Sequence, residues 1–328
     1  MVRNHRLTVA AATREKPGLC REGKTPVAYR YAVLDVFTDK PLAGNALAVL
    51  PEAAGLDDGR MQAIASEFNL SETVFVFPPS NPMHTASIRI FTPGRELPFA
   101  GHPTVGTAVL LGRAKVAAGG GGPEIVLVLE EKVGPVRCGV FVQGPRAGHA
   151  IFDLPKKPEA IAMSLERDTI AAAIGVMPTE IGFENHQPVA FSAGVPYAFV
   201  PVRDLEAIAR AGANLSAWNA AFPAETRAAY IYCRQTVGTA HHFHARMFAP
   251  GGGIAEDPAT GSAAAAFAGV ILRFDKLRSG SQRFVIEQGF EMGRPSLIKL
   301  EIDIADGDIA AARIGGDAVV IAEGTLEI

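Results

Sequence analysis

The feature that most constrains the fold of this chain is an internal repeat. The pattern R-x-F-x-P-G occurs in Arg89-Ile-Phe-Thr-Pro-Gly94 and again in Arg246-Met-Phe-Ala-Pro-Gly251. Each copy is followed by an acid, Glu96 or Glu256, which stands five residues before a glycine. Because the same acid and glycine follow both copies, the repeat indicates an ancient duplication, so we expect two halves of similar structure. The alternative is that both are merely loops that precede buried helices.

The stretches that follow the two motifs predict buried helices. Residues 102–114 and 262–273 are apolar almost all round when they are placed on a helix. Such a helix has no face for solvent and must be surrounded by protein, for which the many short strands are the natural wrapping. We therefore predict an α+β fold of two pseudo-symmetric halves. Each half is a curled mixed or antiparallel sheet around a central apolar helix, and one continuous parallel sheet would contradict this.

The length of 328 residues fits two domains, and a Gly/Pro-rich stretch suggests where they divide. Residues 144–148 follow a predicted strand, so we predict a first half over 29–145 and a second half over 146–314. Residues 1–28 are predicted to be a flexible N-terminal extension, because they are basic and lack the apolar region of a secretory signal. A transit-like peptide is the alternative.

Charge and cysteine usage exclude several classes of function. The net charge is −3, from 31 Lys and Arg against 34 Asp and Glu, which argues against binding to nucleic acid or to a membrane surface through bulk charge. No apolar run approaches the ~18 residues of a membrane span. The three cysteines Cys20, Cys138 and Cys233 lie far apart, which is typical of a reducing compartment. We predict a cytoplasmic protein.

The two predicted helix starts suggest a site for a small anion. A helix N-terminus exposes unpaired N–H groups and a partial positive charge. Two such termini facing each other across a cleft would hold a small substrate through its carboxylate. Thr260 and Ser262 add hydroxyl groups at one terminus, and His102 stands at the other. The substrate itself cannot be named, because the loops over residues 184–197 that would shape it carry no recognisable code.

Glu72 is the candidate acid and base. It begins a predicted strand and shares a face with Val74 and Val76. A carboxylate on an apolar face costs free energy unless it is paired or used, and desolvation raises its pKa toward a value useful to a general base. The alternative is a glutamate at a strand end that is turned to solvent or paired with an arginine.

Two further patterns resemble a phosphate-binding loop and a metal site but give little support for either. Residues 251–253 are all glycine but lack the G-x-x-x-x-G-K-[ST] pattern of a phosphate-binding loop. His242 and His244 share a strand face, yet a metal site there would need a third ligand from elsewhere, so a polar strand face is favoured. We therefore predict no metal site.

Four short motifs together point to one family. They are Ala43-Gly-Asn45, Ser71-Glu-Thr73, Glu96-Leu-Pro-Phe-Ala-Gly-His-Pro103 and Glu256-Asp-Pro-Ala-Thr-Gly-Ser262. In this order and spacing they resemble the PhzF (phenazine biosynthesis-like) family, whose fold is that of diaminopimelate epimerase. The resemblance runs from about Tyr29 to the C-terminus. In related folds the last strand crosses back, which implies that residues near 315–328 complete the first half.

The resemblance implies an isomerase that needs no cofactor and moves a proton between carbons of a small carboxylated amino, hydroxy or cyclic acid. In the phenazine enzyme the substrate is a dihydro-hydroxyanthranilate. The proton shuttle of the family corresponds to Glu72, and the other catalytic positions correspond to His102 and Asp257. The candidate substrate-binding residues are Asn45, Gly101, Thr260, Gly261 and Ser262. Family members are commonly homodimers, so a homodimer is expected.

Two alternatives to this isomerase stay open. One is a non-catalytic member that binds a small acid or a protein, and the other is an epimerase that uses Glu72 and Asp257 as opposite bases. The two-thiol mechanism of related epimerases and proline racemases is excluded, because the matching stretches 100–102 and 259–262 contain no cysteine.

Overall fold

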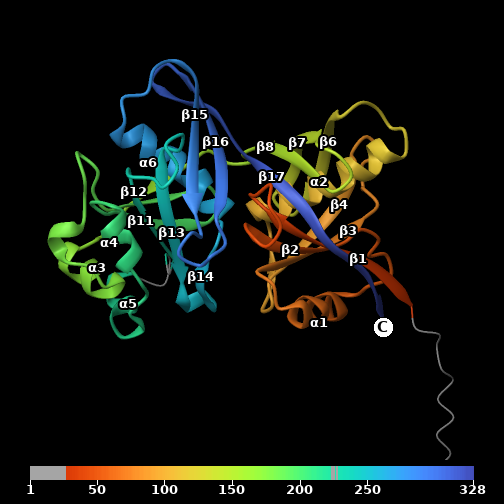
Figure 1. The fold of residues 1–328 in the computed structure, drawn as a ribbon, viewed down its shortest axis with the longest axis horizontal. Helices are drawn as coiled ribbons and strands as arrows, with labels where there is room; N and C mark the ends of the chain where they lie inside the picture. Colours follow the sequence, from red (N-terminus) through yellow and green to blue (C-terminus); the bar gives the residue numbers. More distant parts are fainter. Residues whose placement is uncertain (1–26, 223–225, 227) are drawn as a thin grey trace, which may run out of the picture.

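The computed structural model describes residues 27–222, 226 and 228–328 of the chain. The predicted N-terminal extension lies outside the described residues except for its last two. The described elements form two lobes that lie side by side, and one long C-terminal strand runs across both (Figure 1). In the described part of the chain, no helix is long and apolar enough to cross a membrane.

The first lobe holds two helices and eight strands. They are β1 (Ala28–Val36), β2 (Asn45–Leu50), α1 (Asp58–Phe68), β3 (Glu72–Phe77), β4 (Ala86–Phe91), β5 (Glu96–Leu97), α2 (Gly101–Ala117), β6 (Glu124–Glu131), β7 (Gly134–Val142) and β8 (Ala147–Asp153). The strands wrap α2. This helix packs mainly against β1, β2, β3, β6, β7 and β8. Every residue from 101 to 110 is buried, as expected of a helix without a polar face.

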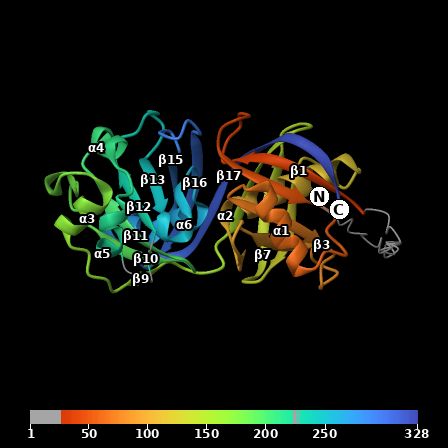
Figure 2. The same ribbon diagram turned by 90° about the horizontal axis from the view of Figure 1, so that it is seen from below.

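The second lobe repeats this arrangement around α6 (Gly261–Phe274). Its other elements are β9 (Glu159–Ile161), α3 (Arg167–Ile174), η1 (Pro178–Glu180), β10 (Val189–Ser192), β11 (Pro196–Pro201), α4 (Leu205–Arg210), α5 (Leu215–Ala221), β12 (Ala229–Cys233), β13 (Phe243–Ala249), η3 (Pro250–Gly252), β14 (Ile254–Asp257), β15 (Gly280–Gln288) and β16 (Ser296–Ala305). Helix α6 packs against β9, β10, β11 and β16, while α3, α4 and α5 lie on the outer side of the lobe (Figure 2).

Strand β17 (Asp308–Glu327) joins the two lobes. Its first part pairs with β16, its middle with β8, and its last part with β1. Both α2 and α6 pack against it. Strand β8, which follows the predicted division at residue 145, pairs with β7 and packs against α2. The division of the chain at that point stays a prediction.

The sheets are mixed rather than parallel throughout. Most neighbouring strands are antiparallel, as in β6 with β7 and β15 with β16, whereas β2 with β3 and β11 with β12 are parallel. A mixed fold of helices and strands was predicted and is confirmed. Cys138 and Cys233 are buried free thiols, and Cys20 lies outside the described residues.

Candidate active site

Helices α2 and α6 meet at their first residues. A Cβ atom added to Gly101 would lie 2.8 Å from the Cα atom of Gly261, and one added to Gly261 would lie 3.0 Å from the Cα atom of Gly101. Only glycine allows so close an approach of two backbones. The N-cap residues Ala100 and Thr260 make no side-chain capping bond, so the first N–H groups of both helices lack a side-chain cap. Two positive helix ends therefore converge on one place.

Glu72 and His102 face each other beside this junction. Glu72 begins β3 and is 8% exposed, while His102 is the second residue of α2 and is 4% exposed. The Oε2 atom of Glu72 lies 3.1 Å from Nε2 of His102. The contact lacks hydrogen-bond geometry, and neither atom has another hydrogen-bond partner among the described residues. Both atoms are thus buried without a hydrogen bond from the described residues.

Burial shifts the pKa values of this pair in opposite directions. Desolvation raises the pKa of Glu72 well above its ordinary value, and the charge of Asp257 raises it further. Burial lowers the pKa of His102 to about 3, so its ring is neutral. The amide nitrogen of Asn45 lies 3.3 Å from Nδ1 of His102.

Asp257, at the end of β14, is held from both lobes. Its Oδ1 atom accepts a bond from Asn45 at 2.8 Å, and its Oδ2 atom accepts one from the Thr260 hydroxyl at 2.6 Å. Asn45 also donates to the carbonyl of Ala259 at 3.0 Å. Burial raises the pKa of Asp257 to about 6, although the bonds from Thr260 and Asn45 oppose this shift. Asn45 therefore links His102 to Asp257 across the two lobes.

The structure thus brings together every predicted site residue. Those of the first lobe are Asn45, Glu72, Gly101 and His102, and those of the second are Asp257, Thr260, Gly261 and Ser262. Their roles stay predictions.

Sequence reasoning missed Tyr197 and Gln288, which form hydrogen bonds with residues of this site. The Tyr197 hydroxyl, from β11, lies 2.8 Å from the Ser262 hydroxyl. Gln288, from β15, donates to the backbone carbonyl of Asp257 at 2.8 Å and accepts from the backbone N–H of Thr260 at 3.1 Å. Neither residue belongs to a motif, and the only signal was that Tyr197 ends the segment 184–197.

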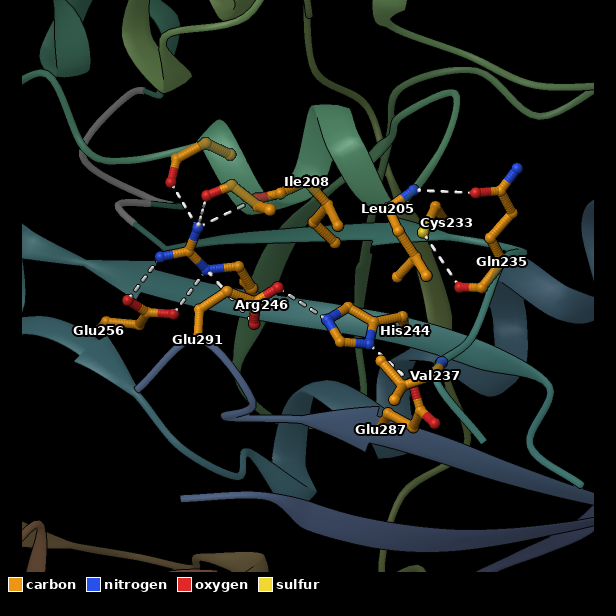
Figure 3. Close-up of polar contacts among 12 residues, drawn as sticks. Leu205, Ile208, Cys233, Gln235, Val237, His244, Arg246, Glu256, Glu287 and Glu291 are labelled. Carbon is orange, nitrogen blue, oxygen red and sulfur yellow. Dashed lines mark hydrogen bonds and ion pairs between the residues drawn. The ribbon is translucent and has the colours of Figure 1, made fainter. Parts of the chain in front are cut away.

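The two repeated acids pair with the two repeated arginines. Arg246 donates from two nitrogens to Glu256 at 2.7 and 2.8 Å, and Arg89 does the same to Glu96 at 2.8 and 2.7 Å. Each fork closes the hairpin of strands that leads into α6 or α2. Arg246 also donates to backbone carbonyls of residues 208, 209 and 211 (Figure 3). The repeated motif therefore fixes the approach to each helix N-terminus.

His244 lies beside Arg246 on β13 (Figure 3). Its Nδ1 atom lies 2.8 Å from Glu287, and its Nε2 atom lies 2.9 Å from Glu291. Carboxylates only accept, so both ring nitrogens carry protons. Burial alone would lower the pKa of His244, but the bonds to the two glutamates outweigh it and raise the pKa to about 9. Among the residues that the structure describes, no group of His, Cys, Asp or Glu could hold a metal ion.

Comparison with known proteins gives a family and close relatives. The family model described as phenazine biosynthesis-like protein matches residues 34–324. An uncharacterized isomerase from Mesorhizobium japonicum is 52% identical over 302 residues, which cover 91% of this chain and 98% of the relative. The trans-2,3-dihydro-3-hydroxyanthranilate isomerase of Pseudomonas aeruginosa is 34% identical over 297 residues, covering 90% and 98%.

Solved structures share the fold. A PhzF-family phenazine biosynthesis protein of Bacillus anthracis aligns with a TM-score of 0.81 and 25% identity, over 92% of this chain and 100% of that one. A hydroxyproline epimerase from Agrobacterium vitis aligns with a TM-score of 0.60 and 12% identity, over 92% and 93%, which shows a common fold alone. The predicted diaminopimelate epimerase-like fold is confirmed at this level.

Proposed function

The chain belongs to the phenazine biosynthesis-like (PhzF) family and is an isomerase of that family, and on this premise we propose that Glu72 moves a proton between two carbons of a small carboxylated substrate. The observation that carries the proposal is the free Oε2 atom of Glu72, which is buried beside two converging helix N-termini. A base and an anion site are what such a reaction requires.

The substrate carboxylate binds at the junction of α2 and α6. The backbone N–H groups at Gly101 and Gly261 and the hydroxyl of Ser262 supply donors, and the two helix ends supply positive potential. The Pseudomonas aeruginosa relative is named for a dihydro-hydroxyanthranilate, an unsaturated ring that carries a carboxylate, an amine and a hydroxyl group. We propose a substrate of this class, a cyclic unsaturated amino or hydroxy acid.

The chemistry is a one-base proton transfer. The Glu72 carboxylate takes a proton from a ring carbon, and the electron pair of that C–H bond enters the conjugated system of double bonds and the carboxylate. The helix N-termini stabilise the negative charge that develops there. Glu72, now a carboxylic acid, returns the proton to another carbon of the same system, so one C–H bond breaks, one forms and the double bonds shift. Its raised pKa suits both steps.

The hydrogen bonds of Asp257 favour this scheme over an epimerase with two carboxylate bases. Both of its oxygens already accept bonds, from Asn45 and from Thr260. These bonds hold its carboxyl group in place, whereas the Oε2 atom of Glu72 has no such bond among the described residues. We propose instead that Asp257 and Asn45 hold His102 and the start of α6 in place.

Isotope exchange tests the proposal. The protein is incubated in deuterated water with trans-2,3-dihydro-3-hydroxyanthranilate and a panel of related cyclic unsaturated acids. We expect isomerisation with deuterium at one carbon and partial retention of the original hydrogen, because a single carboxyl group carries it. Inversion at one carbon with full solvent exchange would favour the epimerase. An acid that binds and protects against unfolding but never exchanges would favour the non-catalytic binder.

Gly101→Ala is expected to lower turnover about 10²-fold, because its new Cβ would push the two helix ends apart and misplace His102 and the carboxylate site. Initial rates and thermal unfolding measure the effect. Gly94→Ala is the matched control, since a Cβ atom there meets nothing within 4 Å. Equal rates in the two variants would contradict the role given to the helix junction.

The homodimer stays a prediction, which sedimentation at micromolar concentration tests.

A further inference from the structure

Strand β12 carries two tyrosines that are alike in all but their hydrogen bonds. Tyr230 and Tyr232 are both fully buried, and both rings pack against Phe267 of α6. The Tyr232 hydroxyl lies 2.9 Å from Nδ1 of His186. The Tyr230 hydroxyl is buried and has no hydrogen-bond partner among the described residues. A phenylalanine would fill the same space without this unmet hydrogen bond.

The strand register places Tyr230 at the wall of the active site. Tyr230 lies opposite Met247 on β13, and Met247 lies opposite Asp257 on β14. Residues opposite each other on antiparallel strands share a face, so these three side chains form a row that ends at Asp257. On the other side, Tyr230 lies opposite Phe199 of β11, which shares a face with Tyr197.

Electrostatics agree with this placement. Burial raises the pKa of Tyr230, and the charges of Tyr197 and Asp257 raise it further. A phenol that is held neutral both donates and accepts hydrogen bonds. The carboxylate of Asp257 disfavours a second anion nearby, so a hydroxyl or amine group suits this place better than a second carboxylate.

We infer that Tyr230 recognises the substrate, through a hydrogen bond between its hydroxyl and a ring hydroxyl or amine group of the carboxylated substrate. The inference rests on the proposed function and adds the residue that selects among cyclic acids. The carboxylate fixes one edge of the ring at the helix N-termini and Ser262. Tyr230 then binds a substituent at another edge, and the bound substrate supplies the hydrogen bond that the described residues do not.

The first arm of the test compares the stability of Tyr230→Phe and Tyr232→Phe without ligand. We expect Tyr230→Phe to keep or raise the melting temperature, because it removes an unpartnered hydroxyl. Tyr232→Phe should lower the melting temperature by several degrees, because it leaves the buried Nδ1 atom of His186 without its partner. A loss in Tyr230→Phe equal to that in Tyr232→Phe would overturn the inference.

The second arm measures substituent preference by calorimetric titration. The probes are 3-hydroxyanthranilate, a stable aromatic acid with the same substituents as the compound named for the relative, and anthranilate and 3-hydroxybenzoate, which each lack one polar group. The wild-type protein and Tyr232→Phe should prefer the full probe about tenfold over one of the two others. Tyr230→Phe should lose that preference while still binding the carboxylate.

The two proposals fail in different ways. Retention of this preference in Tyr230→Phe would overturn the inference and leave the proposed function standing. If the wild-type protein binds none of the three acids, the substrate class of the proposed function is wrong. The stability arm then still decides whether the Tyr230 hydroxyl is unpartnered in the free protein, which the inference requires.

Discussion

Replacing Glu72 with glutamine is expected to lower turnover by a factor of about 10² to 10⁴, the usual contribution of a positioned acid and base. Glutamine keeps the shape of the side chain but cannot take up a proton. Binding of a carboxylate ligand should survive, because the helix N-termini and Ser262 hold it. Near-normal isotope exchange in Glu72→Gln would falsify the assignment, as would the joint loss of binding and folding.

The stability of the same variant should depend on pH in a defined direction. A carboxyl group whose pKa is raised on folding binds its proton more tightly in the folded state, so it destabilises the fold increasingly as pH rises above about 4.5. Glu72→Gln should therefore gain stability, and the gain should grow with pH. Glu96→Gln is the control of opposite sign, because Arg89 lowers the pKa of Glu96. Its loss of stability should shrink as pH falls, and urea unfolding across a pH series measures both.

Replacing Arg246 with alanine is expected to destabilise the fold by about 3–5 kcal/mol, the usual cost of breaking a buried ion pair. The Arg246 side chain is 9% exposed, and its removal leaves Glu256 and three backbone carbonyls at the end of α4 without their donor. Denaturant unfolding of the variant and the wild-type protein measures the loss.

The repeat supplies a matched control for this measurement. Arg89 forms the same fork, but its side chain is 26% exposed, and Glu96 keeps a second partner in Lys132. Arg89→Ala should therefore cost clearly less than Arg246→Ala. Equal losses would mean that burial does not decide the strength of the two pairs, and a loss below about 1 kcal/mol at Arg246 would place it with surface ion pairs.

The sequence was most informative where one local pattern determined the outcome. The apolar run after each repeat motif predicted a surrounded helix, and α2 and α6 are buried as expected. The alternation from Glu72 to Val76 predicted a carboxylate on a core face, and the Glu72 side chain is buried as expected. The acids Glu96 and Glu256 were seen as part of the repeat, but their pairing with arginine depends on hairpin register, which the spacing alone does not give.

The residues that sequence reasoning missed come from strands far apart along the chain. Tyr197, Tyr230 and Gln288 lie on β11, β12 and β15, and each looks like an ordinary residue of a buried strand. Their importance comes from the side chain that each does or does not contact. A missing partner, as at Tyr230, can be recognised only once every neighbour has been placed.

The crossing of β17 also sets the order in which the molecule can be assembled. Strand β1 is among the earliest described elements to be synthesised, yet one of its two neighbours in the sheet is β17, which is the last. Until β17 emerges from the ribosome, β1 has an open edge that could pair with another chain. The first lobe therefore depends on a contact of very high sequence separation, which is intrinsically slow to form. The first lobe is synthesised before the second, but its sheet is completed only after β17 has paired with β1.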